Sequence, residues 1–468
     1  MPIFRSRFRP CAPLVLGLFA AGCEGILDVD TSGVLTPDDL DAAGPSSIVP
    51  IINGVIYDYH EAVDDIVRYA AVFTDEMISA GSFDQRLQVD LRRIQPSNPA
   101  ITNAVYTPLH QARHLADTTF LVLQSRLSNP DYSSVTGNIR AGMALSKLYG
   151  GYSRLWLGEL YCWSILSGTY PESAPVLPDA RMRHALQVLR EAESAATVIG
   201  YQQVQLAALV GQARAHLWLG EYEQAAAVAA RVPRQFVYQA EYSQNSPSQY
   251  NEVYAETHGD ASPIVTTVGD GAVSGRGFEV FEHFEQFAGL NLIAVRPPGF
   301  FAQSSTIPVN VQLLYTRKDS EMTIASGVEA LLIRAETDVR FGRTADAAAL
   351  LNDLRSDYSF RVAVSSRVEF PGPGFSLEPI TLTGNMSDDL KVIADERARE
   401  LWLTGDRFTT SRRFRREAVG FDLFPPVKTP NGGGDDVAFP IAQEELDANP
   451  NLTSAQACPA DQMIGSWR

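Results

Sequence analysis

The residues with the clearest chemical potential in this chain include a pair of histidines. His110 and His114 are four positions apart in a predicted helix, a spacing that can place two imidazoles on one metal ion. The residues between them lack the glutamate of zinc proteases and include Arg113, a cation that opposes metal binding. Two ordinary helix histidines are therefore the favoured interpretation, and we expect no metal and no cofactor.

The catalytic motifs that a sequence can reveal by itself are missing. The chain has no Gly-x-Ser-x-Gly nucleophile elbow, no Gly-x4-Gly-Lys phosphate loop and no cluster of cysteine and histidine. The glycine pairs in 269–277 have no predicted strand before them, so a dinucleotide site is not indicated. A hydrolase or other enzyme is disfavoured.

Aromatic residues in predicted loops are the remaining candidates for a binding site. A flat ring at the mouth of a pocket can stack on the face of a sugar or another planar ligand. The alternative is that these rings fill hydrophobic gaps within their own loops. The candidate contacts are Phe83, Tyr161, Trp163, Phe300 and Phe301.

Composition limits the classes of partner. The 468 residues are 45% hydrophobic and 20% charged, which is enough to build a large buried core. The net charge of −17 argues against nucleic acid, because binding phosphates requires a basic surface.

The first 22 residues have the pattern of an export signal. Three arginines precede the apolar run Leu14 to Phe19, which is too short to span a bilayer, and small residues follow it. The stretch 19–23 resembles the signal of a bacterial lipoprotein, in which the cysteine, here Cys23, is lipidated. An ordinary secretory peptide is the alternative. Loss of the leader brings the net charge to −20, so acyl chains rather than charge would hold the protein at a membrane.

Four cysteines leave one possible disulfide in the mature chain. Cys11 leaves with the leader and Cys23 carries lipid, so Cys162 and Cys458 remain. In an exported protein these two can pair, although two free thiols are an equal alternative.

Repeated helical hairpins predict the fold. Leu155-Trp156-Leu157-Gly158-Glu159 recurs as Leu217-Trp218-Leu219-Gly220-Glu221, and small residues keep the same spacing around Gly342. We therefore predict an all-α, mainly helical chain with a tetratricopeptide-like scaffold in one domain, 23–468. The hairpins are expected near 140–198, 204–232, 327–355 and 387–416, and loop-rich insertions at 160–180, 238–311 and 362–386.

One basic cluster stands out in the acidic chain. Arg412, Arg413, Arg415 and Arg416 follow the last strongly predicted helix. We expect them to pair with buried acids or helix ends rather than to bind a polyanion.

The C-terminal part of the chain resembles a known family. The segment 395–408, followed by Arg412-Arg413, resembles the late signature of the SusD/RagB family of outer-membrane lipoproteins, and 439–452 resembles its closing motif. The lipoprotein leader, the tether 26–29 and the hairpin 331–355 fit the same pattern.

This resemblance implies both a fold and a role. It implies four tetratricopeptide-like units that carry a ligand site on long loops. It also implies a binding protein, not an enzyme, that is anchored in the cell outer membrane and exposed at the surface. Such a protein captures a glycan or peptide nutrient, here expected to be an oligosaccharide, for a TonB-dependent, SusC-like transporter. The ligand-contacting aromatics of the family have no portable motif, so the resemblance assigns none of the five candidates.

A scaffold role is the rival interpretation. A helical-repeat lipoprotein could organise envelope assembly by binding protein alone. The long insertions with aromatic residues favour nutrient binding, since a scaffold has less need of them.

Overall fold

A computed structural model of the chain describes residues 44–79, 83–165, 174–258, 264–266, 293–295, 310–312, 314–356, 377–424 and 433–452. The chain divides into two units, 1–47 and 48–468. In the first unit the description is confined to the 3-10 turn η1 (Gly44–Ser47). The predicted leader, Cys23 and the tether lie outside the described residues.

The second unit is mainly helical, which confirms the predicted fold class. Its helices are α2 (Ile48–Phe73), α3 (Asp84–Asp90), α4 (Pro99–Ile101), η2 (Thr102–Tyr106), α5 (Thr107–Leu127), η3 (Pro130–Val135), α6 (Thr136–Leu160), α7 (Pro178–Ile199), α8 (Gln202–Trp218), α9 (Tyr222–Ala229), η4 (Pro247–Gln249), α10 (Glu252–His258), α12 (Gly327–Arg340), α13 (Thr344–Ser356), α15 (Met386–Glu400), α16 (Asp406–Glu417) and α17 (Gln443–Ala448).

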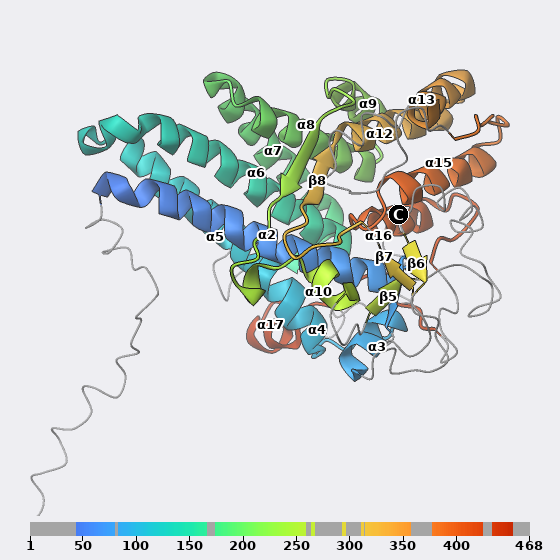
Figure 1. The fold of residues 1–468 in the computed structure, drawn as a ribbon, viewed down its shortest axis with the longest axis horizontal. Coiled ribbons are helices and arrows are strands. Elements are labelled where there is room, and N and C mark those ends of the chain that lie inside the picture. The colour runs from blue at the N-terminus through green and yellow to red at the C-terminus, as the bar shows by residue number, and fades with distance from the viewer. Residues whose placement is uncertain are drawn as a thin grey trace, which may run out of the picture. The chain divides into compact units, whose positions relative to one another are not determined.

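Four helix pairs form the frame of this unit. The pairs are α6 with α7, α8 with α9, α12 with α13, and α15 with α16. Successive pairs pack against one another, and α6, α7 and α8 lie side by side in Figure 1. Helix α2 packs against α5 and α6, and α16 returns to contact both α2 and α6.

Left-handed glycines mark the turns of three pairs, at Gly220, Gly342 and, between α15 and α16, Gly405, but not of the first. Gly220 and Gly342 have φ of 73° and 71°, the left-handed conformation that ends a helix and favours glycine. Gly158, which the sequence repeat aligned with them, lies inside α6. A Cβ there would come 2.9 Å from Met182 Cε, so Gly158 serves close helix packing rather than a turn.

Side-chain caps fix several helix starts. The Ser326 side chain accepts the N–H of Glu329 at the start of α12. Asn385 caps α15 by accepting the N–H groups of Ser387 and Asp388. Satisfying these N–H groups sets where each helix begins.

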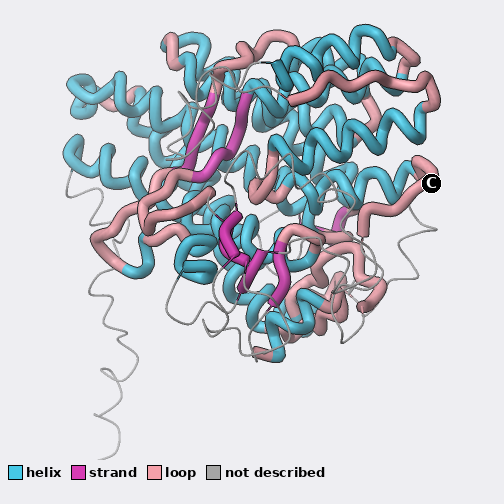
Figure 2. Tube along the Cα trace, turned by 45° about the vertical axis from the view of Figure 1, so that its right-hand side comes forward, coloured by secondary structure: helices cyan, strands magenta, loops and turns pink. Residues whose placement is uncertain are grey.

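Short strands connect the helical frame, as Figure 2 shows in magenta. The strands are β1 (Met77–Ser79), β2 (Ser164–Ile165), β3 (Pro175–Val176), β4 (Val237–Ala240), β5 (Ile264–Thr266), β6 (Ile293–Val295), β7 (Asn310–Gln312) and β8 (Met322–Ser326). They form three sheets, with the orders β1-β5-β7-β6, β2-β3 and β4-β8, and all the pairs are antiparallel. The predicted insertions 160–180 and 238–311 therefore contain strands, and the second also contains α10.

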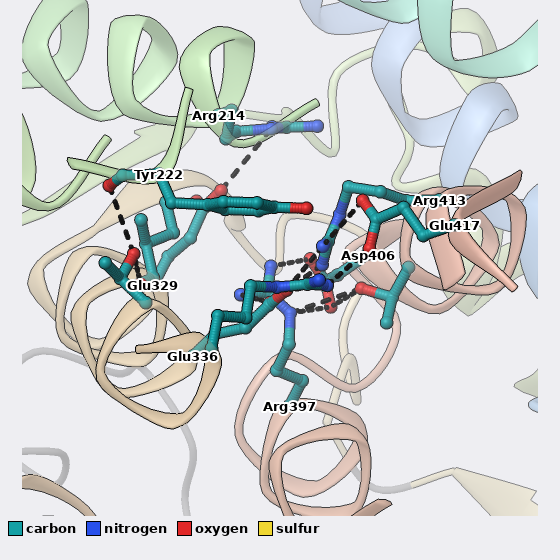
Figure 3. A network of polar contacts seen from close by, with 12 residues as sticks. Arg214, Tyr222, Glu329, Glu336, Arg397, Asp406, Arg413 and Glu417 are labelled. Atoms are coloured by element: carbon teal, nitrogen blue, oxygen red, sulfur yellow. Dashed lines mark hydrogen bonds and ion pairs between the residues drawn. The ribbon is translucent and has the colours of Figure 1, made fainter. Parts of the chain in front are cut away.

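Buried charges join the last two pairs to the rest of the frame. Figure 3 shows Glu336 of α12 meeting Arg397 of α15 and Arg413 of α16, while Arg214 of α8 lies apart from them and pairs with Glu329 of α12. Glu336 is fully buried and accepts hydrogen bonds from Arg413 Nη2 and Arg340 Nη2, each at 2.8 Å. These cations lower the pKa of Glu336 to about 2, against the opposing effect of burial.

The arginines of the basic cluster 412–416 form their contacts within this frame, as predicted. Arg413 pairs with Glu336, Arg415 Nη1 lies 3.0 Å from Asp422, and Arg416 Nη1 lies 2.9 Å from Asp179. Arg412 donates to backbone carbonyls at the end of α6. The cluster therefore holds helices together.

Candidate functional site

One face of α2 is polar although most of the helix is buried. Tyr57, His60, Glu61, Asp64, Asp65 and Arg68 follow one another at steps of three and one, which places them on one side of a helix. The remaining residues of α2 are mainly apolar and face the core. This helix therefore presents a row of polar groups on a rigid support.

The segment 241–252 forms the opposite wall. Strand β4, paired with β8, leads into it, and Asn251 fixes its far end. Asn251 is fully buried, donates from Nδ2 to the carbonyl of Ser320 at 2.9 Å, and accepts the N–H of Tyr254 at 2.9 Å at the start of α10. A loop held at both ends can keep a binding surface in place.

Between these walls lies a cavity of about 450 Å³. Its size falls in the range of small-molecule sites. The residues that line it are Tyr57, His60, Glu61, Asp64, Asp65, Arg68, Glu241, Tyr242, Ser243, Ser248, Gln249, Tyr250 and Glu252. Carboxylates and hydroxyls accept hydrogen bonds from a polyhydroxylated ligand, and tyrosine rings offer flat apolar faces.

Hydrogen bonds between the walls hold the cavity open in one shape. The hydroxyl of Tyr242 donates to the carbonyl of His60 at 3.0 Å, and that of Tyr57 to Ser248 at 3.3 Å. The N–H of Glu241 donates to His60 Nδ1 at 3.1 Å, and His60 Nε2 lies 3.2 Å from the hydroxyl of Tyr149. Burial lowers the pKa of His60 to about 4, so the ring is neutral and acts as a bridge between the walls.

Acidic groups dominate the inner wall. Asp64 Oδ2 accepts the N–H of Glu252 at 3.0 Å, while its Oδ1 has no hydrogen-bond partner. Burial, and after it the charge of Asp65, raises the pKa of Asp64 well above its usual range. Burial also raises the pKa of Asp65 to about 7, although Arg68 opposes the shift. Arg68 is surrounded by carboxylates, since it contacts Asp65, Glu252 at 2.9 Å and Glu256 at 2.9 Å.

The exposed ring of Phe83 is connected to the cavity wall through Arg86 and Glu256. Phe83 is 54% exposed, and the guanidinium of Arg86 lies 5.2 Å from its ring centre. Arg86 pairs with Glu256, which in turn pairs with Arg68 in the cavity wall. Phe83, a predicted contact residue, is therefore linked to the cavity through two ion pairs.

Comparison with known proteins finds a family resemblance in the C-terminal part of the chain. Residues 328–457 match the model of the SusD family, and this span contains α12, α13, α15, α16 and α17. This part of the chain is similar to the SusD/RagB family. No curated protein matches it.

Solved SusD structures share the fold. A SusD superfamily protein from Bacteroides thetaiotaomicron aligns with 88% of this chain and 99% of its own at a TM-score of 0.62 and 14% identity. One from Bacteroides vulgatus covers 87% of this chain and 98% of its own, with a TM-score of 0.61 and 15% identity. A SusD-like carbohydrate binding protein from Bacteroides vulgatus covers 80% of this chain and 84% of its own, with a TM-score of 0.56 and 12% identity.

The motifs that resemble the SusD/RagB family are structural in this protein. From the segment 395–408, Arg397 pairs with Asp406, and Arg407 donates to Asp75 at the end of α2 at 2.7 and 2.6 Å. Phe439 of the closing motif is fully buried, and its N–H donates to the carbonyl of Leu160 at 2.8 Å. These motifs hold the SusD-like frame together and do not line the cavity.

Of the other predicted contact residues, Tyr161 and Trp163 do not line this cavity. Tyr161 is fully buried between Tyr106 and Phe439, so it fills a hydrophobic gap and is removed from the candidate contacts. Trp163 is half-buried and packs against the core. Phe300 and Phe301 lie outside the described residues.

The structure describes one of the two cysteines of the predicted disulfide. Cys162 is 2% exposed and is disulfide-bonded. Cys458 lies outside the described residues, so its pairing with Cys162 stays a prediction.

The two histidines of the helix α5 have different surroundings. The His110 ring packs against Tyr106 with centres 4.5 Å apart, and burial lowers its pKa well below the usual range, whereas His114 is exposed. Across the described ranges, no group of three or more His, Cys, Asp or Glu is placed to hold a metal ion. The helices of those ranges include none long and apolar enough to cross a membrane.

The sequence analysis did not identify the cavity residues, although those on α2 form a recognisable pattern. The polar row of α2 has helical spacing within an apolar helix, and such a row indicates a second, non-core function for that face. The opposite wall has no such signal, because 241–252 reads as loop and lies far from α2 in the sequence.

Proposed function

We propose that this SusD-like protein is a lipid-anchored protein of the cell outer membrane that binds a nutrient and delivers it to a TonB-dependent transporter. The nutrient is an oligosaccharide, and the cavity beside α2 binds part of it. The role is binding without catalysis. The observation that carries the proposal is the cavity itself, in which carboxylates and tyrosines meet on a family frame.

Three further observations support this role. A structural relative of the same fold is a SusD-like carbohydrate binding protein. The sequence carries a lipoprotein-type leader ending at Cys23. Tyr57, at 38% exposure, and Phe83, at 54%, offer aromatic surface on which sugar rings can stack.

Ligand binding is tested by calorimetry with a panel of oligosaccharides and the purified protein. Replacing Tyr57 or Phe83 with alanine removes a stacking surface and should weaken binding about tenfold. Phe341→Ala is the matched control for Tyr57→Ala, because Phe341 is also exposed, at 46%, but does not line the cavity. Phe83 does not line the cavity either, and its variant tests whether the site extends along the ion pairs from Arg68 through Glu256 to Arg86. Equal loss in all three variants would contradict the placement of the site.

Anchoring and delivery need a cellular test. Labelled fatty acid should be incorporated by the natural protein and not by Cys23→Ser. A large β-barrel transporter should copurify from solubilised outer membranes. Recovery as an unlabelled periplasmic monomer would contradict this part of the proposal and leave ligand binding to be judged by calorimetry.

The rival scaffold role, a helical-repeat lipoprotein that acts in envelope assembly, predicts a different outcome. A scaffold needs no small-molecule site, so no oligosaccharide or peptide should bind and Tyr57→Ala should change nothing. The partly open cavity, in which carboxylates and tyrosines lie together, favours nutrient binding over this role.

A further inference from the structure

The cavity beside α2 is lined by more acidic than basic residues. Among its lining residues five are acids, Glu61, Asp64, Asp65, Glu241 and Glu252, and Arg68 is the one Lys or Arg. Arg68 is already matched by Asp65, Glu252 and Glu256. In the described part of the chain no Lys or Arg pairs with Glu61, Asp64 or Glu241. The walls are therefore short of positive charge.

A second observation at the inner wall points to a missing partner. Asp64 is 2% exposed, yet its Oδ1 has no hydrogen-bond partner. A buried carboxylate oxygen left unpaired costs free energy that a hydrogen-bond donor would recover. The raised pKa of Asp64 agrees with this, because a nearby cation would stabilise its ionised form.

The geometry favours an organic cation. No set of three or more acidic, cysteine or histidine side chains in the described ranges is arranged around one point as metal coordination requires. Three tyrosines, Tyr57, Tyr242 and Tyr250, share the cavity with the acids. Carboxylates beside aromatic rings suit an ammonium group, which forms hydrogen bonds with the former and cation–π contacts with the latter.

We propose that the cavity beside α2 selects a ligand that carries a primary ammonium group, which sits against Glu61 and Asp64. The inference rests on the proposed nutrient-binding function and names the class of nutrient. Such a group belongs to an unacetylated amino sugar or to the lysine or N-terminus of a peptide. Glycans with carboxylate or sulfate groups are disfavoured, because the acidic walls repel them.

Matched pairs of ligands test the charge. Calorimetry on the full-length lipoprotein in detergent compares a glucosamine tetramer with the N-acetylglucosamine tetramer, which lacks the positive charge. A lysine tripeptide and its fully acetylated form provide the peptide arm. In at least one arm the charged ligand should bind about tenfold more tightly, and added salt should reduce the difference. The arm with the larger difference identifies the source of the amine.

Matched variants test the residues. Glu61→Gln removes a charge from an exposed position and should weaken the charged ligand about threefold to fivefold without affecting the neutral one. Asp64→Asn keeps an acceptor for the N–H of Glu252 and should reduce the preference further. Glu223→Gln, on the exposed side of α9 and away from the cavity, is the control and should change nothing.

The outcomes distinguish the ammonium site from the proposed nutrient-binding function. Equal affinity for charged and acetylated ligands, or a preference unchanged in both Glu61→Gln and Asp64→Asn, would overturn the ammonium site. If a neutral oligosaccharide then bound and Tyr57→Ala abolished that binding, the nutrient-binding function would stand. Failure of every oligosaccharide and peptide to bind would contradict both.

Discussion

Single buried carboxylates determine how this protein responds to pH. Glu76 is 3% exposed, and its Oε1 accepts the N–H of Leu403 at 3.0 Å. Burial raises the pKa of Glu76 to about 8, and the charge of Asp75 adds to the shift. Between the unfolded value near 4.5 and about 8, the folded state therefore holds a proton that the unfolded state has lost. The free energy of unfolding must then fall as the pH rises through this window.

Replacing Glu76 with glutamine tests this residue. The amide keeps an acceptor for Leu403 but cannot ionise, so the variant should lose this part of the pH dependence. Glu76 contributes up to about 1.4 kcal/mol per pH unit in the window, and the variant should be the more stable protein at pH 8. Urea denaturation at pH 5, 6.5 and 8 measures the effect, with Glu223→Gln as the control. Parallel pH profiles for the natural protein and Glu76→Gln would contradict the prediction.

Glu336 illustrates the opposite case, a buried acid that is fully paired. Its carboxylate neutralises Arg413 and Arg340, so Glu336→Ala should leave these two buried cations to share Glu417 and cost about 3–5 kcal/mol of unfolding free energy. Asp353→Ala breaks the surface pair with Arg234, in which Asp353 is 54% exposed, and should cost about 1 kcal/mol or less. Chemical denaturation compares the two. A similar cost for both would show that the buried network does not stabilise the frame.

At the scale of elements, the turns of the helix pairs differ in what surrounds them. Gly405 has φ of 81°, and a Cβ there would meet Trp156 at 2.8 Å, whereas nothing lies within 4 Å of a Cβ at Gly220, whose φ is 73°. Gly220→Ala should therefore cost about 1 kcal/mol, the strain of a left-handed alanine. Gly405→Ala should cost about 1–3 kcal/mol more, because the ring must move. Melting temperatures of the two variants check this, and equal losses would contradict the packing contribution.

The helix pairs were predictable because their information is local. The spacing of small residues around Gly220 and Gly342 and the strength of the surrounding helix formers fix both helices and turn within a short segment. The repeat predicts a turn at Gly158, but there the same five-residue sequence continues the helix α6. Close packing against Met182 decides that position, and a partner so placed cannot be read from local sequence.

The candidate site was less predictable because it joins distant segments. Loop aromatics suggested Tyr161, but burial against Tyr106 and Phe439 depends on contacts across the chain. The α2 wall could have been recognised from its polar row, whereas Tyr242 and Glu252 reach it through the pairing of β4 with β8 and the anchoring of Asn251. Neither of these contacts leaves a pattern in the sequence.

At the scale of the second unit, the C-terminal motifs and the cavity beside α2 use different residues. Arg407 and Phe439, from the two C-terminal motifs, reach back to Asp75 and Leu160 and so fix α2 and α6 relative to the last helices. The cavity lies on another part of α2 and uses none of these residues. Substitutions that line the cavity can therefore be made without breaking these contacts of the frame.

We predict a disulfide between two distant parts of the chain. Cys162 follows the end of α6 and is disulfide-bonded, and Cys458 would be the other available cysteine if, as we propose, the leader is removed and Cys23 is lipidated. A bond between them would close most of the mature chain into one loop and stabilise it by about 2–5 kcal/mol through the unfolded state. A non-reducing peptide map should recover the two cysteines in one linked fragment.

Three variants show whether the two cysteines act as a pair. Cys162→Ser and Cys458→Ser should each lower the denaturation midpoint, and the double variant should lose little more than either one, because the second change removes a bond already broken. A free thiol should become detectable in each single variant after unfolding. Additive losses, or a linked fragment that joins Cys162 to another cysteine, would contradict this pairing. Noncovalent contacts, such as that between Phe439 and Leu160, would then be what holds the C-terminal segment against the end of α6.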